Sequence, residues 1–184
     1  MRRGVTAIES LLSIAIVSIA GAALLSALAS AVRTSREIAL TTVAQGLADQ
    51  LLVEVAASPV PPEFVSGKPA GPRSNFQVVD HFQGWSASPP QDRFGRLLGT
   101  EGTSPGETAS TRPVAMQADL GLLARFRRSI TVERVAPSGG GWSTTESTAT
   151  PFRRVTVRVL FSDDGRDRQL AESSRIVCHV SPSL

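Results

Sequence analysis

Few residues of this 184-residue chain have types and spacings that could support chemistry, and the first is a carboxylate beside a long apolar run. Glu9 immediately precedes residues 10–32, which carry no charged side chain and consist mainly of Leu, Ile, Val and Ala. A carboxylate at the edge of a hydrocarbon-like environment costs a few kcal/mol unless an opposite charge meets it. The chemistry expected of Glu9 is therefore charge pairing in a low-dielectric environment.

The side chains most often used in catalysis are scarce. Cys178 and His179 are adjacent, so on a strand they point to opposite faces and cannot form a nucleophile–base pair. We expect Cys178 to be a small core residue and His81 to lie at a surface or edge. One cysteine and two histidines exclude a disulfide framework and argue against a metalloenzyme. No catalytic residue, metal or cofactor is predicted, and the chain is not expected to be an enzyme.

Three aspartates, Asp163, Asp164 and Asp167, lie close together at a predicted turn. Turn aspartates sometimes bind calcium, but this spacing does not match an EF-hand loop. We favour a solvated turn and keep calcium binding as the alternative.

A group of five arginines raises the question of a basic patch for DNA or acidic lipid. The net charge is only +3, aromatic residues make up 5% of the chain and tyrosine is absent, so stacking on bases is poorly supported. We do not expect a nucleic acid partner. The arginines are Arg125, Arg127, Arg128, Arg153 and Arg154.

Residues 10–32 are long enough to cross a membrane. These 23 residues exceed the roughly 20 that a helix needs to span a bilayer core. Two arginines precede the run and two follow it, so the arginines alone do not orient the span. The free amine of Met1 adds one positive charge to the N-terminal side and favours a cytoplasmic N-terminus. A secretory signal peptide cut after Ala29 and a plain signal anchor are alternatives, but neither gives Glu9 a purpose.

The residues before the apolar run form a recognisable pattern. A short basic leader ends at Gly4, and Val5, Thr6, Ile8 and Glu9 stand first, second, fourth and fifth after it. This pattern resembles the type IV prepilin and type II secretion pseudopilin family. The resemblance implies that a prepilin peptidase cuts between Gly4 and Val5 and methylates the new amine of Val5.

The resemblance also implies partners and a location. The partners are other pilin or pseudopilin subunits, the prepilin peptidase and the bacterial inner membrane. The N-terminus is cytoplasmic and the globular domain periplasmic, until the subunit moves into a filament or to the cell surface.

The expected cut gives Glu9 a physical role. Loss of Arg2 and Arg3 takes the formal charge from +3 to +1 and leaves a cationic amine at the head of an apolar helix. When such helices bundle, that amine enters a low-dielectric core, where an unpaired charge costs several kcal/mol. Glu9 of a neighbouring subunit is placed to pair with it and to fix the register of assembly.

Beyond the membrane run the helix is predicted to continue. No proline occurs between Met1 and Ser58, so we predict one helix from about Thr6 to Ala57. Its second half carries an amphipathic stripe of apolar residues at spacings of three and four. These residues are Leu40, Val43, Leu47, Leu51 and Val55.

The remainder alternates turns with short apolar patterns. We predict a short strand over residues 76–82 and three better strands from residue 126 to a turn at 137–141, over 155–161 and over 176–180. A hairpin turn is predicted at residues 163–166, and loops are predicted at 58–75 and 99–113. The fold class is α+β and pilin-like, with a long helix covering a small antiparallel sheet.

Four segments follow from these patterns. They are a leader at 1–4, the transmembrane half of the helix at 5–32, its amphipathic half at 33–57 and a β-rich globular domain at 58–184. The expected function is that of a minor pilin or pseudopilin, a structural subunit of a type IV pilus or type II secretion pseudopilus. The alternative is a single-pass membrane-anchored or secreted binding module without filament assembly.

Overall fold

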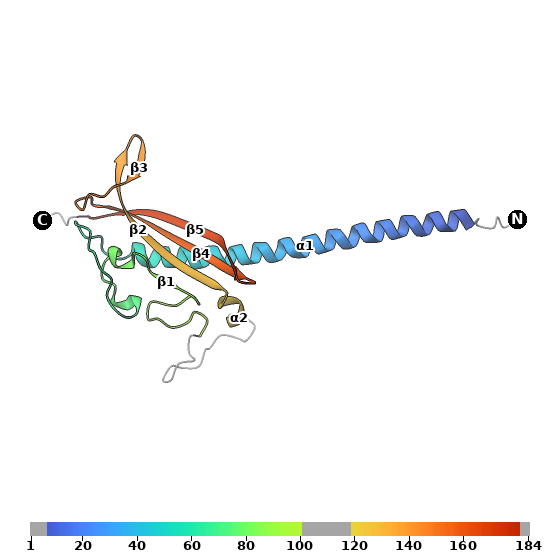
Figure 1. The fold of residues 1–184 in the computed structure, drawn as a ribbon, viewed down its shortest axis with the longest axis horizontal. Coiled ribbons are helices and arrows are strands. Elements are labelled where there is room, and N and C mark those ends of the chain that lie inside the picture. Colours follow the sequence, from blue (N-terminus) through green and yellow to red (C-terminus); the bar gives the residue numbers. More distant parts are fainter. Residues whose placement is uncertain (1–6, 101–118, 181–184) are drawn as a thin grey trace. The chain divides into compact units, whose positions relative to one another are not determined.

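A computed structural model describes residues 7–100 and 119–180 of the chain. The chain divides into two compact units, residues 1–41 and residues 42–184. A single helix, α1, enters both units, and the strands all belong to the second (Figure 1).

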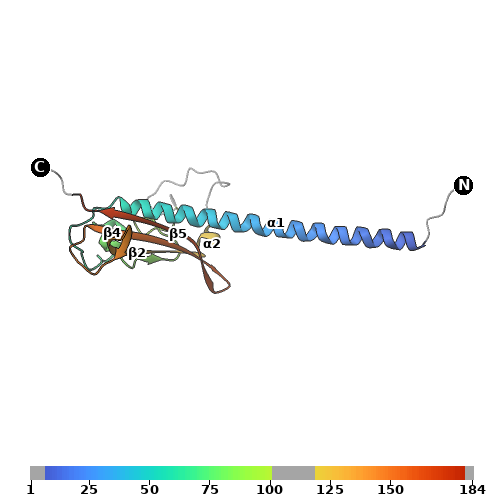
Figure 2. The same cartoon turned by 90° about the horizontal axis from the view of Figure 1, so that it is seen from above.

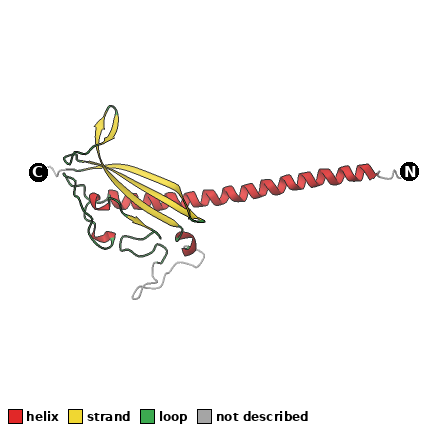
Figure 3. Ribbon diagram, viewed as in Figure 1, coloured by secondary structure: helices red, strands yellow, loops and turns green. Residues whose placement is uncertain are grey.

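Helix α1 (Ala7–Ala56) is one unbroken helix of 50 residues, drawn in red in Figure 3. At 1.5 Å per residue this corresponds to about 75 Å. The helix ends where Ala57 and Ser58 donate backbone hydrogen bonds to Val53 and Val55, immediately before Pro59. The predicted helix is confirmed over these residues.

The sheet is antiparallel throughout and has five strands in the order β1-β2-β4-β5, with β3 paired to β2. The three strands predicted from residue 126 onwards are confirmed as β2, β4 and β5, although β5 ends at Cys178 and not at residue 180, and β3 was not predicted. Asp164 (φ 48°) and Gly165 (φ 78°) make the predicted hairpin turn between the last two strands. The bounds are β1 (Ser86–Ala87), β2 (Phe126–Ser138), β3 (Gly141–Thr144), β4 (Phe152–Asp163) and β5 (Arg166–Cys178).

Residues 42–56 of α1 pack on one face of this sheet (Figure 2). The buried helix surface includes Leu51 and Val55, as the stripe predicted, but Val43 is 36% exposed. Ala44 and Ala48 are completely buried in its place. Their small side chains let the helix backbone approach the sheet closely, which moves the contact face by one residue from the predicted stripe.

The sheet face towards α1 is formed by alternating residues of the two central strands. Pairing of Ile130 with Val157 and of Val132 with Val155 places these side chains on one face, and all four are buried. The opposite face carries three cross-strand ion pairs. They are Arg127–Asp167 at 2.9 Å, Arg158–Glu172 at 2.8 Å and Arg154–Glu133 at 3.8 Å.

The strand predicted over residues 76–82 is absent, and this prediction is wrong. The segment instead contains the 3-10 turn η2 (Val79–Phe82), preceded by η1 (Arg73–Asn75). Phe76, Val79 and Phe82 are buried, a spacing of three that suits one face of a 3-10 turn rather than a strand.

One buried and one partly buried ion pair hold these turns against the rest of the domain. Arg153 of β4 binds Asp80 of η2 with Nε 2.7 Å from Oδ1, and both side chains are fully buried. Arg73 of η1 donates two 2.9 Å hydrogen bonds to Glu54 of α1, and its guanidinium lies 4.3 Å from the Trp85 ring centroid.

Candidate functional site

Three residues make up the predicted processing and assembly site. Gly4 and Val5, where cleavage and methylation are expected, lie outside the described residues. Glu9 is described and lies near the N-terminal end of α1, where its side chain is exposed. The geometry of the site is therefore that of Glu9 and the helix that follows it.

Glu9 shares a face of α1 with apolar side chains. Leu12 and Ile16 follow at three and seven residues and are 60% and 58% exposed. The Ser13 hydroxyl donates a 2.8 Å hydrogen bond to the Glu9 carbonyl oxygen, so this hydroxyl is satisfied within the helix. The Glu9 carboxylate thus stands at the head of a surface that is otherwise apolar.

The apolar surface extends along the first unit of the chain. Large apolar side chains from Ile8 to Ile38 are between 58% and 78% exposed. In water so much contiguous apolar surface is unfavourable, and it needs cover from lipid or from other helices. Helix α1 is the helix among the described residues that is long and apolar enough to cross a membrane.

Hydroxyl groups in this part of α1 are compatible with an apolar environment. The Thr34 hydroxyl donates to the Ser30 carbonyl oxygen at 3.0 Å, in the same way as Ser13 does to Glu9. Such bonds satisfy polar groups inside the helix, which a lipid or protein interior requires. The arrangement can insert into a membrane or pack against similar helices.

No family model, curated protein or solved structure matches the chain. A long N-terminal apolar helix on a small antiparallel sheet is a pilin-like architecture.

The reactive side chains considered from the sequence are Cys178, His179 and His81. Cys178 is exposed at the end of β5, so its predicted core position is wrong. It pairs with Phe152 on the face away from α1, and its side chain is open to solvent there. His179 instead places Nδ1 2.7 Å from the Val60 carbonyl oxygen, and His81 Nδ1 accepts from the Gln77 amide at 3.2 Å.

The predicted turn aspartates are used in ion pairs. Asp163 binds Arg125, and Asp167 binds Arg127. Within residues 7–100 and 119–180 no group of three or more His, Cys, Asp or Glu side chains could hold a metal ion.

The five arginines weighed as a basic patch are not gathered on one surface. Arg128 and Arg153 are 1% and 0% exposed on the sheet face that α1 covers. Arg154 pairs with Glu133, Arg125 pairs with Asp163, and Arg127 pairs with Asp167. These five side chains therefore do not form a basic docking surface.

The burial of Arg128 and Arg153 was not predicted, although the alternation of residues along the strands indicates it. Arg153 has the same parity as Val155 and Val157, and Arg128 has that of Phe126 and Ile130. An inward arginine requires acceptors, so this parity would have directed attention to Asp80 and to the buried carbonyl groups nearby.

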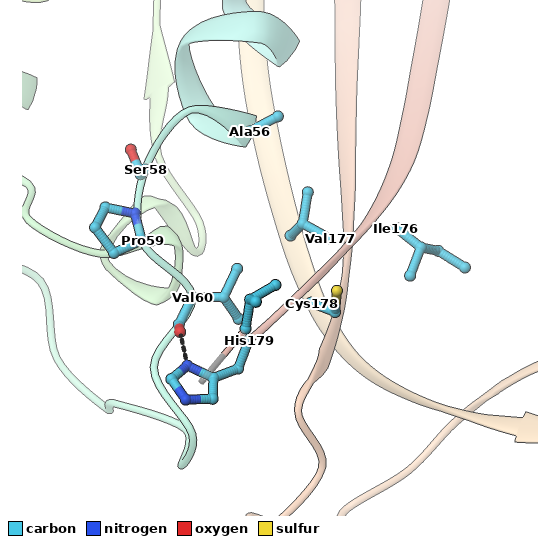
Figure 4. Close-up of a pocket in the computed structure, with 9 residues that line it drawn as sticks. Ala56, Ser58, Pro59, Val60, Ile176, Val177, Cys178 and His179 are labelled. Carbon is cyan, nitrogen blue, oxygen red and sulfur yellow. Dashed lines mark hydrogen bonds between the residues drawn. The ribbon is translucent and has the colours of Figure 1, made fainter. Parts of the chain in front are cut away.

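A cavity of about 510 Å³ lies between the end of α1 and the end of β5 (Figure 4). Val177 points towards Ala56 and Val60, and Ile176 points away from them. The residues that line this cavity are Ala56, Ser58, Pro59, Val60 and the five residues from Ile176 to Val180.

Proposed function

We propose that the protein is a minor pilin- or pseudopilin-like structural subunit. In this proposal a prepilin peptidase cuts after Gly4, and the subunit then joins a type IV pilus or a type II secretion pseudopilus. The observation that carries the proposal is Glu9 at the head of an exposed apolar helix whose later part packs on a small antiparallel sheet.

The proposed mechanism is assembly through the helix. Before assembly, residues 10–32 lie in the inner membrane, and the second unit is held on the periplasmic side. In the filament the same apolar side chains pack against neighbouring helices, so lipid cover is replaced by protein cover. The sheet domain then faces outwards, where it meets neighbouring subunits or cargo.

Glu9 sets the register in this mechanism. The methylated amine of Val5 is a cation that enters a low-dielectric core, where removing one member of an ion pair costs about 3–5 kcal/mol. Pairing with Glu9 of a neighbouring subunit is satisfied in one axial position only. The subunit itself performs no catalysis, and it is a substrate of the peptidase.

The first test is the N-terminal mass of the protein recovered from cells. The proposal expects a chain that begins at Val5 and carries one methyl group. A chain that begins at Met1 would indicate a membrane-anchored module, and one that begins at Ser30 a secreted module. Either of these results would overturn the proposal.

The second test separates processing from assembly. Glu9→Gln removes the charge and keeps the side-chain shape, so we expect membrane insertion to continue and filament incorporation to fail. Ser10→Ala, next to it on the helix, is the matched control and should assemble normally. Normal assembly of the Glu9→Gln protein would show that charge pairing is not required.

A further inference from the structure

Strand β5 is the last strand of the sheet order and pairs with β4 along one side only. The His179 amide donates to the Pro151 carbonyl oxygen at 2.9 Å, so the backbone groups of His179 face β4. Because this direction alternates along an antiparallel strand, the N–H and C=O groups of Ser174, Ile176 and Cys178 face the opposite side.

These outward groups are open to a partner. Within residues 7–100 and 119–180, no hydrogen bond satisfies the backbone N–H or C=O of Ser174, Ile176 or Cys178 on that side. Ser174 and Cys178 are exposed, and Ile176 is half-buried. Such a row of unpaired groups is a template for an added strand.

A bulge limits how far this open edge extends. The pairing register between β4 and β5 shifts at Val159/Leu160, so one β5 residue, Leu170, is left without a partner. Bulges twist a strand and interrupt further pairing. The regular part of the edge is therefore the short segment from residue 172 to residue 178.

The cavity in Figure 4 lies beside the C-terminal part of this edge. Val177 lies on the sheet face towards α1 and points into the space bounded by Ala56, Pro59 and Val60. The hydrogen bond from His179 to Val60 holds the far wall in place. An apolar side chain opposite Val177 on an added strand would enter this space.

The charges of β5 favour an acidic partner. Its two carboxylates, Asp167 and Glu172, are engaged by Arg127 and Arg158 across the sheet. Arg175 is exposed and forms no ion pair with any residue that the structure describes. Arg175 and Val177 are two residues apart, so both lie on the sheet face towards α1.

We propose that the β5 edge from residue 174 to residue 178 binds an extended segment of a partner protein by strand addition. Main-chain hydrogen bonds to Ser174, Ile176 and Cys178 supply the affinity. A carboxylate opposite Arg175 and an apolar side chain opposite Val177 supply the specificity. The recognised pattern is an acidic and an apolar residue separated by one residue. This inference goes beyond the proposed function and does not depend on cleavage after Gly4.

The test attaches a probe strand to the full chain in detergent micelles. A flexible Gly/Ser linker after Leu184 carries the sequence Thr-Thr-Val-Thr-Glu-Thr-Thr, which can fold back antiparallel to β5. Tethering raises the effective concentration of the strand to the millimolar range. Amide hydrogen exchange of Ser174, Ile176 and Cys178 is expected to slow by about tenfold or more relative to the untagged chain.

Two controls decide whether strand addition causes the protection. A probe with Pro in place of the Thr between Val and Glu should give none, because it cannot pair as a strand. In β5 itself, the substitution Ser174→Pro removes one outward N–H and should abolish protection at Ile176 and Cys178. Ser174→Ala loses the same hydroxyl but keeps the N–H, so protection should remain.

A charge exchange tests the specificity. Arg175→Glu should weaken the protection that the original probe gives. A probe with Lys in place of its Glu should restore protection in this variant, while amide exchange in β2 stays unchanged. Equal protection by the proline-interrupted probe, or no protection by the original probe, would overturn the proposal. Neither result bears on the N-terminal mass, so failure here is distinguishable from failure of the proposed function.

Discussion

The guanidinium of Arg153 and the carboxylate of Asp80 form an ion pair that has no contact with solvent, with Nε 2.7 Å from Oδ1. The other Asp80 oxygen, Oδ2, accepts from the Val65 amide at 2.9 Å, and Arg153 Nη1 donates to the Thr150 carbonyl oxygen at 2.6 Å. The pair therefore joins the irregular segment after α1 to the central strand β4, with its buried polar groups hydrogen-bonded.

Asp80→Asn should destabilise the sheet domain by about 3–5 kcal/mol, because Arg153 would remain buried without an opposite charge. Denaturant unfolding of the full chain in micelles, followed by tryptophan fluorescence, measures the change. Glu172→Gln is the matched control, since its partner Arg158 is 44% exposed and exposed pairs contribute less than about 1 kcal/mol. Equal effects of the two substitutions would contradict the assigned role of burial.

Alternation of apolar residues was sufficient to predict β2, β4 and β5, and the proline-free N-terminal run was sufficient to predict α1. These signals are local, because periods of two and 3.6 residues report which face of an element is buried. The irregular segment between α1 and β2 lacks such a signal. Its turns are held by Asp80 and Arg73, whose partners on β4 and α1 lie far away in the sequence.

Arg128 differs from the other buried arginines because its acceptors are uncharged. It donates to the carbonyl oxygens of Leu47 and Gln91 and to the Gln50 side chain, and its buried Nε has no partner among the described residues. Burial, reinforced by the nearby Arg73 charge, lowers the pKa of Arg128 to about 10, although Glu54 opposes this shift. The side chain therefore stays charged at neutral pH at an energetic cost.

Arg128→Met should be neutral or stabilising by about 1–4 kcal/mol, because it replaces a poorly compensated buried charge by an apolar side chain of similar volume. Arg73→Met is the contrasting substitution and should destabilise by about 1–3 kcal/mol, since it leaves Glu54 without two hydrogen bonds. Unfolding free energies of the two variants measure the difference. A large loss of stability in Arg128→Met would show that its uncharged acceptors compensate the charge after all.

Asp49 on α1 accepts a 2.7 Å hydrogen bond from the Ser173 hydroxyl of β5. This bond, together with a second from Gln45, lowers the pKa of Asp49 below its ordinary value. A carboxyl with a lowered folded-state pKa stabilises the fold above its unfolded-state pKa, and this contribution is lost as the pH falls through the folded-state value.

Ser173→Ala should therefore raise the pKa of Asp49 towards its ordinary value and weaken the acid dependence of stability. A titration of the Asp49 carboxyl carbon by NMR in wild-type and variant chains measures the shift. Ser174→Ala, the neighbouring serine that pairs with Thr156 instead, should leave the Asp49 titration unchanged. A pKa shift of equal size in both variants would mean that the Ser173 hydrogen bond does not cause the lowered pKa of Asp49.

The functional site was predictable only in part, for a physical reason. A carboxylate next to an uncharged run can be read from the sequence, because its cost in an apolar environment does not depend on the fold. The open edge of β5 could not be read in this way. It depends on the strand order and on the His179–Pro151 hydrogen bond, which determines which backbone groups of β5 face away from β4. It also depends on the segment 56–60, which bounds the cavity.

Ile19→Arg tests whether the first part of α1 is held by a bilayer. An arginine near the middle of a membrane helix costs about 3 kcal/mol, so the variant should be found less often in the membrane fraction after alkaline extraction. Val53→Arg is the matched control, because Val53 is 59% exposed on the same helix, against 71% for Ile19, but lies outside the uncharged run. The control should fractionate as the wild type does. Release of the wild-type chain by the same alkaline extraction would mean that a bilayer does not hold residues 10–32, and the membrane-stored stage of the proposed assembly would have to be abandoned.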